Sequence, residues 1–213
     1  AKSQYGIDVG TAEGAAGAEQ TVEDRLVKLD WNINDDHRAS VRWQKTDQVE
    51  PIFSGFSATG IALSSYLYSE VKNNESTVVQ WFGDWTPNFS TEVKLSQRDF
   101  GKDHANNAYL PAMALQFTGP LPAGTPSSVR TGSRFINFGT ERSRQFNRLE
   151  TKAQDAYVGA TWVQGDHEVK FGGDYSKTEI FNAFLQDVNG NYTFGCTNSS
   201  ATYTYELGAV NCS

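Results

Sequence analysis

Apolar and polar residues alternate over long stretches of this chain, and these stretches are paired around short turns. The pairs are residues 22–33 and 38–48, 76–86 and 91–102, and 148–164 and 168–182. Because successive side chains of a strand point to opposite faces, each stretch has one apolar and one polar face. The pattern predicts an all-β protein with three antiparallel hairpins. A further strand is expected at 63–72, where Tyr66 and Tyr68 share a face.

A tryptophan lies on the apolar face shortly before each turn. These residues are Trp31, Trp85 and Trp162, and the turns are Asn34-Asp35-Asp36-His37, Pro87-Asn88 and Gly165-Asp166-His167. Aromatic rings gather at membrane–water interfaces. The stretches also supply the roughly 9–11 residues of a tilted membrane strand, more than the about five or six of a soluble strand. The pattern predicts an antiparallel transmembrane β-barrel segment with the tryptophans in a periplasmic girdle; a soluble sheet with one face on a core is the alternative.

Long polar intervals separate the hairpins at the end opposite the short turns. They cover about 1–21, 49–62, 103–147 and 183–213. Bacterial barrels have short periplasmic turns and longer extracellular loops, so we expect these intervals to be extracellular. Four prolines disfavour continuous strand pairing in the third interval, namely Pro111, Pro120, Pro122 and Pro126.

Four polar residues interrupt the apolar faces toward the loop ends, namely Arg25, Lys45, Gln97 and Asp99. Long side chains can reach water from the edge of a membrane. This explanation fits Gln97 and Asp99 less well, and we expect a β-bulge to shift the register near them.

Composition narrows the classes of function. The chain has 213 residues and a net charge of −7 without a general basic pattern, so nucleic-acid binding is not expected. There is no apolar run of eighteen residues and hence no expected membrane helix. Residues 1–20 do not resemble a signal peptide, and we expect a mature or truncated product. No sequence pattern predicts a catalytic group, a metal site or a cofactor.

The two cysteines, Cys196 and Cys212, both fall in the last interval. A pair in one irregular stretch predicts a disulfide in an oxidising compartment. Closing a loop of this length would stabilise the segment by about 3 kcal/mol. A metal site would need more ligands, and no histidine is close in sequence.

Residues around the turns resemble hairpins of TonB-dependent outer-membrane receptors, specifically the Oar-like branch. The stretches that carry the resemblance run from Lys28 to Arg38, from Asn88 to Glu92, from Ser96 to Asp99 and from Gly165 to Tyr175. The similarity covers roughly residues 22–185. It implies a barrel of about twenty-two strands and an N-terminal plug domain. It also implies energised uptake of a large or scarce substrate across the outer membrane, driven by the TonB complex.

The expected six or seven strands are fewer than the eight of the smallest bacterial barrels, and lipid does not tolerate open sheet edges. We therefore expect a segment of a longer protein, without the plug domain. Its expected partners are outer-membrane lipid and lipopolysaccharide, the TonB complex, the remainder of the barrel and the plug.

Residues 127–152 carry a local charge balance of +4 within an acidic chain. The arginines there are Arg130, Arg134, Arg142, Arg144 and Arg148, and aromatic residues of the same interval are Tyr109, Phe117, Phe135, Phe138 and Phe146. Guanidinium groups bind carboxylates and phosphates. These residues are candidates for substrate contact; pairing of the arginines with plug carboxylates or lipopolysaccharide phosphates is equally open.

Two other classes of function are considered. An outer-membrane enzyme would need a nucleophile or activated water beside a base, and only His104, with Asp99 and Asp103, is near the expected outer rim. A secreted β-sandwich or adhesin is compatible with five Asn-x-Ser/Thr triplets, which begin at Asn74, Asn88, Asn191, Asn198 and Asn211.

Overall fold

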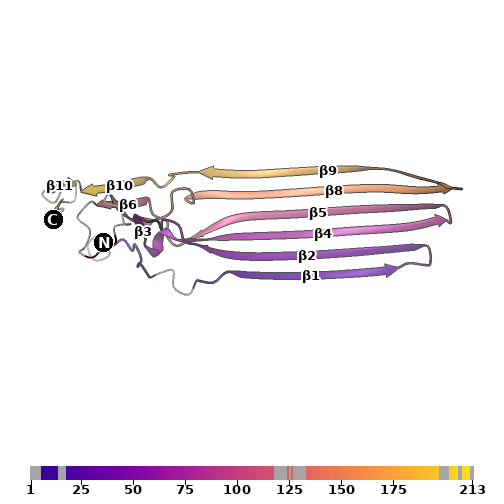
Figure 1. The fold of residues 1–213 in the computed structure, drawn as a ribbon, viewed down its shortest axis with the longest axis horizontal. Helices are drawn as coiled ribbons and strands as arrows, with labels where there is room; N and C mark the ends of the chain where they lie inside the picture. Colours follow the sequence, from indigo (N-terminus) through magenta and orange to yellow (C-terminus); the bar gives the residue numbers. More distant parts are fainter. Residues whose placement is uncertain are drawn as a thin grey trace.

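The structure is a computed structural model that describes residues 6–13, 18–117, 124, 126, 133–196, 202–205 and 208–211. These residues form twelve strands and one short 3-10 helix, η1 (Ser64–Tyr66), arranged as one long sheet with smaller elements at its loop end (Figure 1). No helix within the described ranges is long and apolar enough to cross a membrane.

Six long strands form one antiparallel sheet, in the order β1-β2-β4-β5-β8-β9. Their bounds are Thr21–Asn32, His37–Ile52, Tyr68–Thr86, Phe89–Asn106, Phe146–Gln164 and His167–Leu185. The all-β class and the three hairpins are therefore confirmed. The strand expected at 76–86 lies within β4, whereas the separate strand expected at 63–72 was wrong, because β4 begins at Tyr68, after η1, and continues without a break to Thr86.

Local chemistry closes the short turns. The Asn34 side-chain oxygen accepts hydrogen bonds from the backbone N–H groups of Asp36 and His37 at 2.9 and 2.8 Å. At the third turn Gly165 adopts a φ of +58°, a left-handed conformation that a glycine reaches without a side-chain penalty. The side chain of an asparagine thus closes the first turn by hydrogen bonding to the backbone two and three residues later.

The register aligns the apolar residues into rows that cross all six strands. One row is Leu29, Val41, Val79, Leu95, Ala156 and Tyr175; the next toward the turns is Trp31, Ala39, Trp81, Val93, Val158 and Gly173. We call this side the apolar face and the opposite side the polar face. The register is unbroken at Gln97 and Asp99, so the bulge expected there is wrong; the one irregularity between β4 and β5 lies at Asp84/Thr86, beside the turn.

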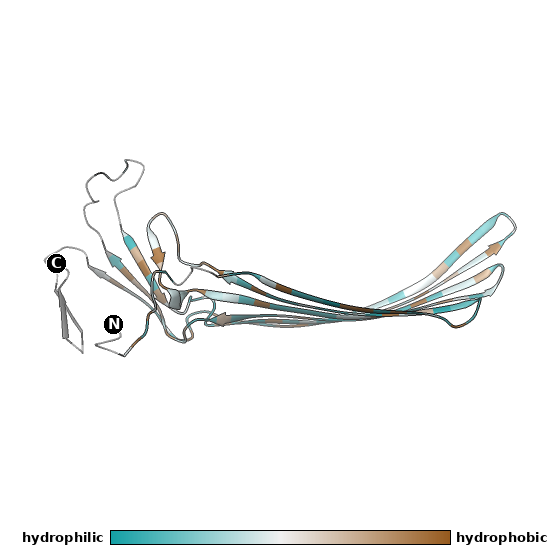
Figure 2. Cartoon of the chain, turned by 90° about the horizontal axis from the view of Figure 1, so that it is seen from below, coloured by the Kyte–Doolittle hydropathy of each residue, from teal (hydrophilic) through white to brown (hydrophobic). Residues whose placement is uncertain are grey.

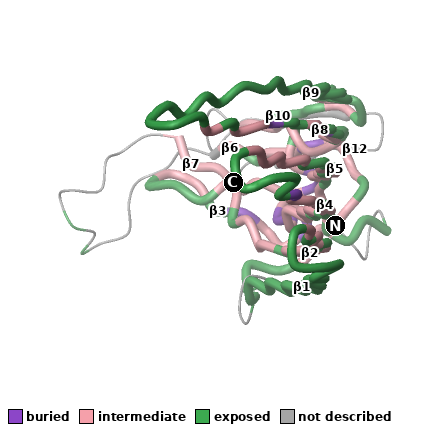
Figure 3. The backbone as a smooth tube through the Cα atoms, turned by 90° about the vertical axis from the view of Figure 1, so that its right-hand side faces the viewer, coloured by how far each residue is buried: buried purple, intermediate pink, exposed green. Residues whose placement is uncertain are grey.

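A second sheet of four short strands forms at the loop end, in the order β10-β6-β7-β3. Its strands are Asn191–Cys196, Ala112–Phe117, Arg134–Gly139 and Gly60–Ala62. It lies on the side toward which the long sheet curves (Figure 2, Figure 3). The irregular intervals expected at 49–62, 103–147 and 183–213 thus contain strands, and Pro111 stands just outside β6. Strands β11 (Thr202–Tyr205) and β12 (Gly208–Asn211) form a separate hairpin.

Burial differs sharply between the two sheets (Figure 3). Most of the buried residues gather around the small sheet, among them Ala62, Ser65, Leu67, Ala112 and Thr140, whereas the long sheet is largely exposed or half-buried on both faces, with Ala153 as a buried exception. The Thr140 hydroxyl donates to the Ala108 carbonyl at 2.6 Å and accepts from the Leu110 N–H at 3.0 Å. The loop end therefore has a packed core of its own.

Candidate functional site at the loop end

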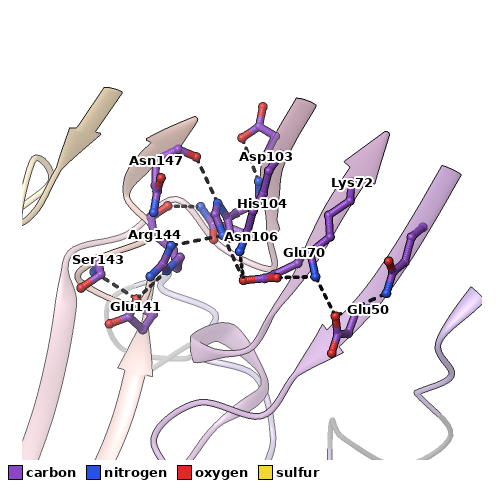
Figure 4. A network of polar contacts seen from close by, with 12 residues as sticks. Glu50, Glu70, Lys72, Asp103, His104, Asn106, Glu141, Ser143, Arg144 and Asn147 are labelled. Atoms are coloured by element: carbon purple, nitrogen blue, oxygen red, sulfur yellow. Dashed lines mark hydrogen bonds and ion pairs between the residues drawn. The ribbon is translucent and has the colours of Figure 1, made fainter. Parts of the chain in front are cut away.

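Charged residues meet on the polar face where β2, β4 and β5 reach the loop end (Figure 4). We call the following residues the polar cluster: Glu50, Glu70, Lys72, Lys102, His104, Glu141 and Arg144. The first five come from the long sheet, and the last two come from the connection between β7 and β8. The cluster lies well beyond the apolar rows, toward the small sheet.

Glu70 is the centre of the ion pairs. Its carboxylate accepts from Lys72 at 2.9 Å and from Lys102 at 2.7 Å, and Lys72 also reaches Glu50 at 2.9 Å. Burial opposes ionisation of this carboxyl, but the hydrogen bonds from Lys102 and Lys72 outweigh it and hold the pKa of Glu70 at about 2. Glu70 therefore stays negative over the physiological range.

His104 connects the ion pairs to the loop, and its side chain is 2 % exposed. Its Nδ1 lies 3.0 Å from the Asn147 carbonyl oxygen, and its Nε2 lies 3.2 Å from an Arg144 guanidinium nitrogen. A carbonyl can only accept and a guanidinium can only donate, so the ring is neutral with its proton on Nδ1. Burial lowers the pKa of His104, which favours this neutral form.

Arg144 holds the connection between β7 and β8 against the long sheet. Its guanidinium lies 5.8 Å from the centre of the Tyr68 ring, and its Nε lies 3.6 Å from a Glu141 carboxylate oxygen. The Asn106 side chain donates to the Arg144 carbonyl at 2.7 Å. The cluster thus anchors the small sheet over one end of the polar face by electrostatic contacts.

The arginines expected to act together are dispersed. Arg144 belongs to the polar cluster, whereas Arg142 pairs with Asp187 at 2.7 Å and Arg148 pairs with Glu150. Arg134 begins β7 and donates to the Ser133 carbonyl. Arg130 lies outside the described residues. The structure therefore brings one predicted arginine, not a group of them, to the cluster.

The predicted aromatic residues are also separated. Tyr109 is 81 % exposed in the connection between β5 and β6. Phe135 and Phe138 point to opposite faces of β7, because they are three residues apart in one strand. Phe146 begins β8 and is exposed. The side chain of Phe117 lies outside the described part of the structure.

The grouping of His104 with Asp99 and Asp103 is not formed. Asp103 accepts from the His104 backbone N–H at 2.8 Å and lies on the apolar face, away from the His104 ring. Asp99, an odd-numbered residue of the same strand, also belongs to that face. The hydrogen-bond partners of the ring, Asn147 and Arg144, are 43 and 40 residues away in sequence, and no local signal indicates them.

Trp31, Trp85 and Trp162 lie near the short turns with 65, 54 and 45 % of their surface exposed. Sequence reasoning missed two neighbours of this group. The His37 ring stacks on Trp81 at 5.6 Å between ring centres and meets the edge of Trp85 at 5.0 Å. Gly83 makes room for them, since a Cβ there would lie 2.9 Å from both the His37 and Trp81 rings.

A shallow hollow of about 470 Å³ lies on the polar face near the turns. Its lining is rich in charge and includes Arg38, Glu92, Lys170, Asp174 and the ring of Tyr157. Arg38 lies 4.9 Å from the centre of the Phe82 ring. No group of three potential metal-ligating residues occurs in the part of the chain that the structure describes. Cys212 and the side chain of Cys196 fall outside that part, so the disulfide stays a prediction.

Comparison with known proteins gives a family. A family model described as an outer membrane beta barrel domain matches residues 8–211. Searches of curated proteins and of solved structures gave no match. The match spans nearly the whole chain, and it favours the membrane barrel over the soluble sheet and the secreted β-sandwich.

Proposed function

The chain belongs to the outer membrane beta barrel domain family and is located in the bacterial outer membrane; from this premise we propose that it forms part of the wall of a TonB-dependent receptor of the Oar-like branch. Such a receptor takes up a large or scarce substrate with energy delivered by the TonB complex. The chain would supply wall and outer rim, and the plug would occupy the lumen.

The proposal rests on the chemical difference between the two faces of the long sheet, one apolar and one charged. The apolar rows suit lipid, while the polar face has a charged hollow near the turns and an ion-pair cluster near the loops. A small barrel fills its interior with its own side chains, whereas a large barrel leaves a lumen that a plug domain can occupy. A wall with charge along its inner side is therefore suited to a plug domain.

Both edges of the long sheet, β1 and β9, are unpaired with further strands in the described residues. Six strands are fewer than the eight of the smallest bacterial barrels, and an open edge is not stable in lipid. The proposal is that further strands complete the wall. In this arrangement the small sheet stands over the mouth of the barrel, where it would narrow the path to the plug.

The test is the accessibility of the hollow in the complete protein, in its own membrane. Asp174→Cys places a thiol in the hollow on the polar face, and Tyr175→Cys places one on the apolar face, outside the hollow, as the matched control. If TonB displaces a plug, a water-soluble maleimide labels Asp174→Cys faster in energised cells than in cells without TonB. Equal labelling in both would contradict TonB-dependent transport, while leaving the barrel itself intact.

A further inference from the structure

The small sheet has one buried face and one apolar face that is partly exposed. Ala62 and Asn137 share the buried face, where the Asn137 amide donates to the Gly55 carbonyl at 3.1 Å. The opposite side, which we call the small-sheet apolar face, carries two rows without a polar residue. They are Ile61, Ile136, Leu115 and Phe194, and Phe138, Met113 and Tyr192. Tyr192 is 52 % exposed, and contiguous apolar surface of this kind marks interaction sites.

Strand β10 forms one edge of the small sheet. The Ala112 N–H donates to the Gly190 carbonyl at 3.0 Å, and Ala112 lies opposite Asn191 in a parallel pairing. This phase directs the backbone groups of every second residue of β10 toward β6 and those of the residues between them to the open side. The open-side residues are Asn191, Thr193 and Gly195, whose backbone groups make no hydrogen bond to another described residue. Such an edge is a template for pairing with another chain.

Two aromatic rings stand beside this open edge. The Tyr192 and Phe194 rings stack with 6.5 Å between their centres and 27° between their planes. Gly190 makes room for the Tyr192 ring, because a Cβ there would lie 2.8 Å from it. Residues two apart on a strand share a face, so the two rings have the spacing of alternate side chains on a neighbouring strand.

The edge and the rings together select one kind of ligand. A sugar or a lipid can cover apolar side chains, but neither carries amide donors and acceptors at the repeat of a β-strand. An extended polypeptide offers both, because its backbone pairs with the edge while every second side chain lies beside Tyr192 or Phe194. The small sheet lies on the side toward which the long sheet curves, so this ligand would lie at the mouth of the barrel (Figure 2, Figure 3).

We propose that β10 captures an extended polypeptide from outside the cell by strand addition, with apolar residues of that polypeptide at alternate positions along the small-sheet apolar face. The inference rests on the orientation of the wall in the proposed function, with the loops outside the cell. It concerns capture and not uptake, so its test needs no TonB. The added strand accounts for the exposure of Tyr192 at an edge that the described residues leave open.

The test uses the complete protein in lipid nanodiscs and two pools of peptides of about seven residues, slightly longer than the six residues of β10. Apolar and polar residues alternate in the first pool, and the same residues stand in blocks in the second. Mass spectrometry identifies the retained peptides, and empty nanodiscs give the background. We expect retention of the first pool over the second. Equal retention of both pools, or retention of neither, would overturn the proposal.

The open edge is then blocked. Thr193→Pro removes an N–H on the open side, where the pairing with β6 does not use it, and is expected to lower retention about tenfold. Thr193→Val keeps this N–H and is expected to retain the peptides as the natural chain does. Slow amide exchange at Ala112 and Ala114, which pair with β10, verifies that the strand stays in place. Unchanged retention by Thr193→Pro would overturn strand addition.

The same contact is tested from the side of the ligand. Methylation of every second backbone nitrogen of the retained peptides is expected to abolish retention in one of the two possible phases, and full retention in both would overturn the proposal. Slow amide exchange at Thr193 without peptide would show that another segment of the protein covers the edge, which would also overturn it. None of these results bears on transport, which the labelling of Asp174→Cys with and without TonB tests separately.

Discussion

The long sheet and the small sheet differ in how far their apolar side chains are buried by the protein itself. In the long sheet, Leu29, Leu95 and Phe171 are each at least half exposed although they lie on the apolar face. In the small sheet, Ala62 and Ala112 are 1 and 3 % exposed. The long sheet is therefore a wall whose stability depends on lipid outside and on other parts of the barrel inside. The loop end carries its own core and depends less on its surroundings.

An exposed side chain therefore has a different environment at the two ends of the molecule. A leucine that is exposed on the apolar face of the long sheet faces lipid, because the family is an outer-membrane one. A polar group buried at the loop end needs a partner within the protein, and Thr140 and His104 have them. Substitutions that are harmless at one end should therefore be costly at the other.

The largest effect is expected from a charge on the apolar face. Val158→Arg places a cation near the middle of the apolar band and should cost about 2–4 kcal/mol of unfolding free energy in lipid vesicles. Thr161→Arg, on the polar face of the same strand, should change it by less than about 0.5 kcal/mol. Denaturant unfolding of the complete protein measures both, and equal effects would mean that the faces are not divided as described.

A loss of about 2 kcal/mol is expected at the loop end from Thr140→Val, because the Ala108 carbonyl and the Leu110 N–H both lose their partner. Amide hydrogen exchange should accelerate at 108–112 and 134–140, while β8 and β9 keep their protection. Thr193→Val, at an exposed position of β10, serves as the control. Acceleration throughout the long sheet would show that the two regions unfold as one unit.

Acid should loosen the loop end in two steps. The lowered pKa of His104 means that the folded form resists protonation, so stability falls as pH drops below the ordinary histidine value of about 6.5. The pKa of Glu70, lowered from 4.5 to about 2, adds stability that is lost as pH falls from about 4.5 to about 2. Hydrogen exchange at 140–147, corrected for the intrinsic rate, should show both steps.

His104→Phe should remove the first step and keep the second. A variant that retained both steps would exclude His104 as the group that titrates near neutral pH. Glu70→Gln should remove the lower step, because its ion pairs with Lys72 and Lys102 are lost.

The smallest effect is expected from an exposed ion pair. Arg148→Gln breaks the contact with Glu150, and both side chains are largely exposed. Such pairs contribute about 0–1 kcal/mol, so the midpoint of unfolding should barely move. A clear loss of stability would contradict the weak, exposed ion pair expected here.

The hairpins were predictable because their information is local. Alternation along each strand and a turn of two to four residues fix each strand pairing. Trp31, Trp85 and Trp162 mark the turn end of each hairpin. The register follows from the apolar pattern, since a shift by one residue would expose every apolar side chain to the wrong face.

The small sheet and the polar cluster were not predictable, because their contacts join distant segments. Strand β10 pairs in parallel with β6, and Asn191 lies opposite Ala112 although 79 residues separate them. Strands of three or six residues show too little alternation to be recognised. The prediction for the arginines rested on composition alone. Of those predicted, Arg144 belongs to the polar cluster because its position in the connection between β7 and β8 places it beside His104.

The most direct test of the central claim is site-directed spin labelling along β8 of the complete protein in its membrane. Labels at 156, 158 and 160 should collide with oxygen, which is enriched in lipid, and labels at 155, 157 and 161 should collide with a water-soluble relaxation agent. This alternation should end at Lys152, where both faces meet water. Uniform exposure to the water-soluble agent from 152 to 162 would contradict a lipid-facing wall.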